Sequence, residues 1–240
     1  MKSTWIVSTF AGMIALGAAG AAIAAPVVLT FEGLKDQEHI LNFYNGGTGS
    51  LGSAGPNFGI GFGADALALI AASAGGSGNF QGEPSAPTIA FFLTGPGDLM
   101  NVAAGFTTGF SFFYSAINNP GSVDVFAGLN GTGALLAHLA LPTTPAGPYG
   151  VPPCPLPAGT PAAFCPWVPI GVAFAGTAES VNFTGTANQI GFDNITLGSQ
   201  NPVVPAPLIG HGLLVVLAVG GVLFGSKLSE SLKKLHLHAA

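Results

Sequence analysis

The last apolar stretch before the C-terminal tail reads Gln189-Ile-Gly-Phe-Asp-Asn-Ile-Thr-Leu197. In a regular strand Ile190 and Phe192 would share one face, and the last two apolar residues of the stretch would share the other. A β-bulge at Asp193-Asn194 would return all four apolar side chains to one face, because it inserts an extra residue. The stretch therefore predicts a bulged core strand with an acidic residue at the bulge.

Similar short apolar stretches recur at intervals of about eight to twelve residues, separated by turn residues. The expected strands are 27–32, 58–62, 88–93, 100–103, 106–114, 122–126, 134–141, 168–174, 180–183 and 189–197, while 65–72 fits either a short helix or a further strand. In 106–114, Phe110, Phe112 and Tyr114 share one face, which indicates a central strand. Asn130-Gly131 predicts a tight hairpin, because both residues accept positive φ.

Composition agrees with this pattern. The 240 residues suffice for one sizeable domain with signals at both ends, and the 37 Gly and 19 Pro suit short strands joined by turns. The apolar content of 49% excludes a disordered chain. We therefore predict an all-β fold, a β-sandwich or jelly-roll ectodomain over residues 25–200, with an N-terminal signal helix and one C-terminal transmembrane helix.

Charge is sparse and unevenly placed. The chain has no Arg, and four of its five Lys lie in the terminal segments. Between residues 25 and 200 only Lys35 is basic, so that region carries a net charge of −8. Nucleic-acid binding is excluded as a function, because it needs clustered cations.

The N-terminus, residues 1–24, has the features of a secretory signal peptide. Lys2 supplies the positive charge, residues 5–23 are apolar, and Ala22-Ile23-Ala24 forms a small-x-small cleavage site. We predict cleavage after Ala24. The alternative is an uncleaved N-terminal anchor.

The C-terminus reads as an anchor or sorting tail. A proline-rich stalk, 201–207, contains Val204-Pro205-Ala206-Pro207 and precedes an apolar segment, 208–225, that contains no charged residue. We predict that 208–225 spans the membrane and that the Lys-containing segment 226–240 is cytoplasmic. The ectodomain then faces outward.

A proline-rich segment, 142–166, interrupts the rhythm of strands and contains both cysteines, Cys154 and Cys165. In an oxidising compartment they should form a disulfide, which would keep this segment compact. A metal site at the cysteines would need further ligands, and no His lies nearby. Two free thiols are the remaining alternative.

These features resemble a known family. The relevant segments are Val204-Pro205-Ala206-Pro207 with the tail after it, Phe31-Glu32-Gly33-Leu34, and the stretches 42–47, 55–60 and 187–195. They resemble bacterial exported proteins with a PEP-CTERM-type sorting tail and a lectin-like β-sandwich. The resemblance implies processing by an exosortase-type membrane protease, and association with the envelope and exopolysaccharide of a Gram-negative bacterium.

One metal-site hypothesis follows from the strand order. In sandwiches the first and last strands often lie side by side, which would bring Glu32 close to Asp193. These carboxylates, with Asn194 and loop carbonyls, are expected to form a structural Ca²⁺ site. In the alternative, Asp193 caps its own bulge and Glu32 is solvated. We expect no other cofactor.

No catalytic constellation is recognisable. The acids are scattered singly, the ectodomain histidines His39 and His138 occur in no triad or metal spacing, and no G-x-S-x-G motif occurs. Sugar binding would instead use exposed aromatic rings. The candidate residues are Tyr44, Phe58, Tyr149 and Trp167.

We therefore expect an exported, non-enzymatic protein, either anchored in the inner membrane or sorted to the cell surface or matrix, where it binds polysaccharide. One alternative is a polysaccharide lyase or hydrolase on this fold. The other is a structural adhesion or matrix subunit that binds other proteins.

Overall fold

The computed structural model describes residues 25–144, 154 and 164–205. The predicted signal peptide, membrane segment and cytoplasmic tail lie outside these residues, as do Ala206, Pro207 and Tyr149. Within the described residues, no helix combines the length and the apolar character needed to cross a membrane.

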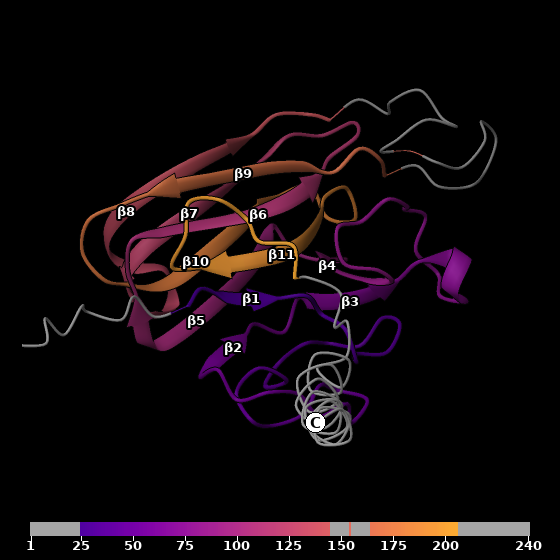
Figure 1. Cartoon of the computed structure of the whole chain (residues 1–240), viewed down its shortest axis with the longest axis horizontal. Coiled ribbons are helices and arrows are strands. Elements are labelled where there is room, and N and C mark those ends of the chain that lie inside the picture. Colours follow the sequence, from indigo (N-terminus) through magenta and orange to yellow (C-terminus); the bar gives the residue numbers. More distant parts are fainter. Residues whose placement is uncertain (1–24, 145–153, 155–163, 206–240) are drawn as a thin grey trace, which may run out of the picture.

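The chain forms two antiparallel sheets (Figure 1). The first sheet has six strands, ordered β3 (Ala66–Ile70), β4 (Thr88–Phe92), β11 (Gly191–Leu197), β6 (Gly109–Ser115) and β9 (Val168–Ala173), with β1 (Val27–Leu29) paired to β11. The second has five, ordered β2 (Ile60–Phe62), β5 (Gly97–Phe106), β10 (Ala178–Gly185), β7 (Gly121–Gly128) and β8 (Thr132–Leu141). Two short 3₁₀ turns, η1 (Ala72–Ala74) and η2 (Leu129–Gly131), complete the elements. The all-β prediction is confirmed, and the arrangement is that of a β-sandwich.

Aromatic rings join the two sheets. Phe110, Phe112 and Tyr114 of β6 are buried on one face of their strand, as predicted. The Phe112 ring lies 6.1 Å from that of Phe183 in β10 and 5.7 Å from that of Phe192 in β11, both edge to face. Edge-to-face pairs of rings stabilise the fold beyond what the burial of their apolar area contributes. This group of rings is therefore a main contact between the two sheets.

The predicted bulge in β11 is present. The pairing of β11 with β6 shifts register between Asp193 and Thr196, and Asn194 has a φ of 48°. The four apolar side chains of the stretch, which lie on both sides of the bulge, are therefore all buried. On the other edge of β11, β4 pairs before the bulge and β1 pairs after it, so the bulge faces the place where these two strands meet.

The hairpin of β7 and β8 turns at η2. Asn130 and Gly131 have φ values of 59° and 67°, as expected for Asn-Gly. Residues 65–72, which the sequence left open between helix and strand, form strand β3 and then η1, because β3 pairs with β4 along its full length.

Several expected strand boundaries are shifted by one to three residues, most of all at the first strand and around residue 106. The first strand ends at Leu29 rather than 32, since Phe31 adopts a φ of 65° that breaks the extended chain. The expected strands 100–103 and 106–114 are instead β5, which runs from Gly97 to Phe106, and β6, which begins at Gly109 after Thr108 turns the chain with a φ of 80°.

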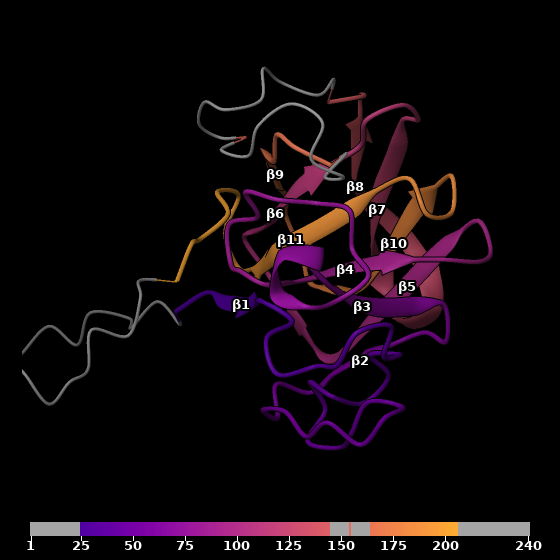
Figure 2. The ribbon, with the colours of Figure 1, turned by 90° about the vertical axis from the view of Figure 1, so that its right-hand side faces the viewer.

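Both chain ends leave the sandwich together. Val27 of β1 pairs with Leu197 of β11, and in Figure 2 the indigo start and the yellow end of the described chain leave on the same side. The long connection between β1 and β2 lies below the strands in both views (Figures 1 and 2). The buried Glu38 fixes this connection by accepting hydrogen bonds from Lys35, Leu51 and Ser53.

Candidate functional site

A buried acidic cluster, formed by Asp193, Asn194 and Ser85, lies at the bulge. The Asp193 carboxylate is fully buried and accepts hydrogen bonds from the backbone N–H of Ser85 at 2.8 Å, the Ser85 hydroxyl at 2.8 Å and the backbone N–H of Asn194 at 2.7 Å. Ser85 lies three residues before the start of β4, so the cluster joins the segment that leads into β4 to the centre of β11.

Three oxygen atoms surround the Ser85 hydroxyl. They are Asn194 Oδ1 at 2.6 Å, Asp193 Oδ1 at 2.8 Å and the Thr30 carbonyl at 3.5 Å. A hydroxyl has one proton to donate, so it cannot donate to all three. The other amide atom of Asn194, Nδ2, is buried without a partner.

Glu32 lies near this cluster, because its charge acts on Asp193. Its Oε1 accepts the backbone N–H of Thr88 at 2.9 Å. Burial raises the pKa of Glu32, and the nearby Glu83 carboxylate raises it further. Burial raises the pKa of Asp193 to about 8, with a smaller contribution from Glu32. The structure thus brings Glu32, Asp193 and Asn194 together through the pairing of the first and last strands.

No cation of the described chain balances these acids. Lys35 is the one basic residue between 25 and 200, and its Nζ donates to the Leu51 carbonyl at 2.7 Å. Over the same described residues, no group of three or more His, Cys, Asp or Glu side chains is placed to hold a metal.

The predicted aromatic ligand residues separate into two groups. Tyr44 and Trp167 are buried, with 3% and 7% of their surface exposed, so neither ring offers a face to a ligand. The Tyr44 hydroxyl accepts the Phe31 N–H at 2.6 Å, and the Trp167 indole donates to the Gln81 carbonyl at 3.1 Å. We do not retain either residue as a ligand contact. Phe58, in contrast, is 42% exposed.

Phe58 lies at a cleft of about 560 Å³ between the edges of the two sheets. The ring stacks on Tyr44, with centroids 6.0 Å apart and an interplanar angle of 12°. Apolar side chains of both sheets and three threonines, Thr107, Thr108 and Thr177, line the cleft, and none of its lining residues is charged. The composition of the loops gave no signal that these threonines would gather there.

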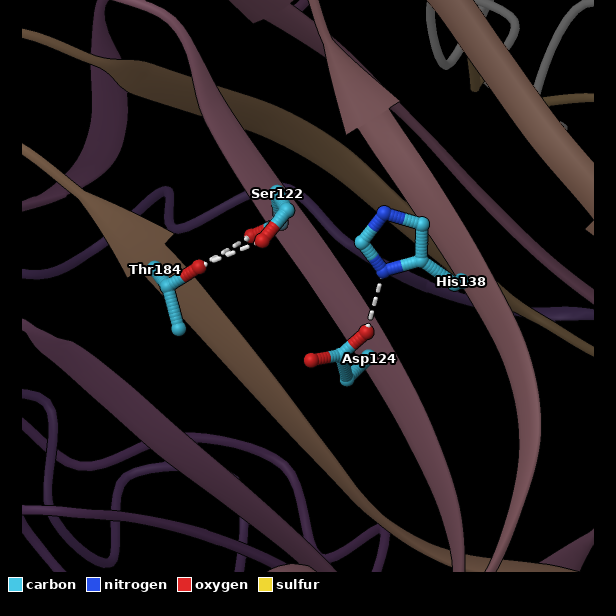
Figure 3. Close-up of polar contacts among 4 residues, drawn as sticks. All are labelled: Ser122, Asp124, His138 and Thr184. Carbon is cyan, nitrogen blue, oxygen red and sulfur yellow. Dashed lines mark hydrogen bonds and ion pairs between the residues drawn. The ribbon is translucent and has the colours of Figure 1, made fainter.

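A polar group on β7, β8 and β10 was also missed from the sequence. His138 Nδ1 lies 2.6 Å from Asp124 Oδ1, and the Ser122 hydroxyl lies 2.6 Å from that of Thr184 (Figure 3). The hairpin register, which pairs Asp124 with His138, could have predicted the first contact. A hydrolytic triad requires the serine to bond the histidine. Here the Ser122 hydroxyl pairs with Thr184 instead.

The predicted disulfide is present. Cys154 and Cys165 are bonded, with their Cα atoms 5.7 Å apart. Both cysteines are buried. Phe164 and Trp167, which flank Cys165 in the sequence, belong to the second, smaller apolar cluster together with Phe80 and Ile89.

Comparison with known proteins finds only weak structural similarities. No protein-family model matches the sequence, and no curated protein sequence matches it. Among solved structures, the K2 cleaved adhesin domain of Lys-gingipain is 12% identical, with a TM-score of 0.42 over 73% of this chain and 100% of that chain. A carbohydrate-binding module from Cellvibrio mixtus lichenase 5A, solved with cellotriose, is 11% identical, with a TM-score of 0.32 over 56% of this chain and 87% of that chain.

A glycoside hydrolase family 43 arabinoxylan arabinofuranohydrolase from Bacillus subtilis is 16% identical, with a TM-score of 0.35 over 63% of this chain and 30% of that chain. The chain is thus similar to adhesin and carbohydrate-binding β-sandwich domains. At these scores the likeness carries no information about its function.

Proposed function

We propose that this protein is an exported, non-enzymatic envelope or matrix protein that binds a neutral polysaccharide in the cleft at Phe58. The observation that supports this function is the exposed aromatic ring. Tyr44 fixes the Phe58 ring from one side by stacking, and the rest of the ring borders the cleft. An immobilised apolar ring gains contact with a sugar face at little cost in side-chain entropy.

The rest of the cleft suits a sugar of no charge. The threonine hydroxyls can both donate and accept hydrogen bonds, as sugar hydroxyls require. No lining residue of the cleft is charged, so the cleft contains no cation that could pair with the carboxylate of a uronic acid. The net charge of −8 over residues 25–200 repels a uronic acid as well. The volume also falls within the usual range for small-molecule and oligosaccharide-sized sites.

Affinity electrophoresis of the mature protein in gels containing xylan, a neutral β-glucan or a polyuronate tests this function. At least one neutral polymer should retard the protein, and the polyuronate should not. Phe58→Ala should weaken binding at least about tenfold, because an aromatic ring that becomes buried under the bound sugar contributes more than about 1.4 kcal/mol to the free energy of binding. Leu135→Ala is the matched control, since this β8 side chain is also exposed, at 55%, but does not line the cleft. Equal binding by wild type and Phe58→Ala would refute the assignment.

The same proposal includes the route to the envelope. Residues 1–24 direct export, residues 208–225 hold the chain in the inner membrane, and Val204-Pro205-Ala206-Pro207 marks the tail for an exosortase-type protease that releases the ectodomain to the surface. Cell fractionation with mass spectrometry of the mature C-terminus tests this route. A C-terminus near Pro205 in the surface fraction supports sorting, whereas an intact tail in the inner membrane supports permanent anchoring. A full-length chain in the cytoplasm would exclude both.

A second candidate function is adhesion to other protein chains. In the described part of the molecule β8 pairs only with β7, so its outer edge is open. The strand contains no Asp, Glu, Lys, Arg or Pro, residue types that protect many edge strands from pairing with another chain. If this edge recruits chains, Leu135→Lys should abolish concentration-dependent association in light scattering, and Leu51→Lys, in the connection between β1 and β2, should not.

A further inference from the structure

We propose that Thr108 determines the specificity of the Phe58 cleft for sugars with free hydroxyl groups, and that the fold holds this residue in a strained turn so that its side chain lines the cleft. The inference rests on the proposed function, because it concerns the same cleft. It adds a substrate class to that function, namely neutral polysaccharides whose hydroxyls are not methylated. It also predicts a cost in stability that can be measured without any ligand.

Thr108 has an unusual backbone conformation for its residue type. Its φ is 80°, the largest among the non-glycine residues with positive φ in the described chain. The others in this group are Phe31, Gln37, Leu41, Asn130, Asn188 and Asn194. Thr108 is thus the one β-branched member, and β-branched residues tolerate this region of backbone angles least. Glycine would adopt the same φ without strain.

Backbone hydrogen bonds alone hold the turn around Thr108. The Gly109 N–H donates to the Thr107 carbonyl at 3.0 Å, which closes a γ-turn centred on Thr108. The form of this turn with positive φ is rare and strained. From outside the turn, the Phe174 N–H donates to the Thr108 carbonyl at 3.4 Å. The Gly198 N–H likewise donates to the Gly109 carbonyl at 2.9 Å. The surrounding chain therefore imposes the strained conformation, and none of these bonds requires a threonine side chain.

The Thr108 hydroxyl contributes little to the fold. Among the described residues its one hydrogen-bond partner is the Thr107 hydroxyl, at 3.5 Å, which is longer than a good hydrogen bond between hydroxyls. Thr108 is exposed and lines the cleft that Phe58 borders. The only polar side chains that line this cleft are threonines. A strained residue whose side chain has no strong contact in the fold, and which lines a cleft, indicates a contact with a ligand.

The part of β5 that leads into this turn also departs from regular pairing. Asn101 pairs with Ser180 of β10, and the next pair is Phe106 with Ala178, so β5 has extra residues opposite β10. The pairing of β5 with β2 ends at Val102. Residues 103–105 therefore have no partner in either neighbouring strand, and 104 and 105 line the cleft. Such interruptions occur next to binding sites, where they redirect side chains.

The position of a hydroxyl on a rigid turn gives it selectivity. A threonine hydroxyl can donate to one sugar hydroxyl and accept from another. Because the side chain is β-branched and has few rotamers, it loses little entropy when it binds. Methylation of the sugar removes the proton that Thr108 would accept and adds bulk at the same point. A site that hydrogen-bonds a hydroxyl discriminates strongly against an analogue that lacks it.

Affinity electrophoresis tests the specificity. The gels contain either the neutral polymer that retards the wild-type mature protein or the same polymer after O-methylation. The wild type should bind the methylated polymer at least about tenfold more weakly. Thr108→Val keeps the branched shape and removes the hydroxyl, so it should weaken binding to the unmodified polymer about five- to tenfold. Thr108→Ser should retain most of the binding. Thr94→Val is the matched control, because Thr94 is also exposed but does not line the cleft, and should bind as the wild type does.

Thermal unfolding without ligand tests the strain. Thr108→Gly should raise Tm by about 2–5 °C, because it releases the strained backbone, and should also lose binding as Thr108→Val does. Thr107→Gly is the control, since Thr107 has no positive φ and glycine there should lower Tm. An unchanged or lower Tm in Thr108→Gly would overturn the proposal.

The outcomes separate this inference from the proposed function. If Phe58→Ala loses binding while Thr108→Val binds as the wild type does, the cleft binds sugar and the role of Thr108 is refuted. Equal binding of the methylated and unmodified polymers by the wild type would refute it as well. If no neutral polymer retards the wild type, the proposed function and this inference are both wrong.

Discussion

Asp98 and Glu38 are both buried acids, but their surroundings shift their pKa values in opposite directions. Burial raises the pKa of Asp98 to about 7, with the Asp65 carboxylate adding to it, and two backbone N–H groups only partly compensate. Burial alone would also raise the pKa of Glu38, but the hydroxyl of Ser53 and three backbone N–H groups outweigh it, so the pKa falls below its usual value. The hydrogen bonds to each carboxylate thus decide how folding depends on pH.

We predict that Asp98→Asn stabilises the protein at alkaline pH. The folded-state pKa of Asp98 lies above the unfolded one, so stability is lost as pH rises from about 4 through about 7. The difference between the folded-state pKa of about 7 and the ordinary value of 3.8 corresponds to a loss of at most about 4 kcal/mol in the free energy of unfolding at pH 8. The uncharged amide in the variant would avoid this loss. Urea unfolding of both proteins at pH 4 and pH 8 measures it. A gain that is equal at the two pH values would contradict this explanation.

Glu38→Gln should destabilise the protein near neutral pH. A neutral amide cannot accept the four hydrogen bonds that the carboxylate accepts, so we expect a loss of about 2–3 kcal/mol. Because the folded-state pKa is lowered, this contribution is present above about pH 4.5 and disappears as pH falls through the folded-state pKa. The difference between wild type and variant should therefore shrink in acid, which urea unfolding at pH 7 and pH 3 would show.

At the scale of elements, the sequence could predict what depends on local periodicity. In a regular strand the apolar residues would change from one face to the other at Asp193-Asn194. This change predicted the bulge, because side chains alternate strictly along a strand. Asn130-Gly131 predicted the hairpin, because few residues accept its backbone angles. The end of β1 was missed, since Phe31 adopts positive φ without any Gly or Asn to signal it.

Contacts between distant loops could not be predicted. Ser85 reaches Asp193 across 108 residues, and nothing in the residues around Ser85 specifies that approach. Residue type also does not tell which aromatic ring is covered. Trp167 is buried because Phe80, from another segment, packs against it at 6.1 Å. Phe58 stays exposed because only one of its faces meets another ring, that of Tyr44.

The β7–β8 turn allows a test of backbone strain alone. Gly131 has a φ of 67°, and a Cβ added there would approach Leu99 at 3.7 Å, which is ordinary contact. Gly131→Ala should therefore cost about 1–2 kcal/mol through the left-handed backbone and not through collision. Chemical denaturation would measure the loss, and Gly131→Asn should recover part of it. Equal stability of wild type and Gly131→Ala would show that the turn relaxes without cost.

At the scale of the whole molecule, the disulfide is an accessory to the sandwich. Cys154 and Cys165 are 11 positions apart, and neither belongs to the larger apolar cluster, which joins the two sheets. Replacing both cysteines by Ser should cost about 3 kcal/mol, the entropy of closing a loop of this length. The β-sheet signal in circular dichroism should persist in the variant at room temperature. Its loss would show that the sheets depend on the bond.

The pairing of β1 with β11 places the cleft where the chain leaves the domain. Leu197 and Gly198, at the end of β11, line the cleft, and Pro205 lies only a few residues further along. A pull between the tail and a ligand in the cleft would thus load one corner of the domain. β11 is bonded to β6 on one side and to β1 and β4 on the other, so extracting it requires shearing both sides at once instead of peeling an edge. If the proposed tail anchors the chain, β11 would therefore resist drag at the point of attachment.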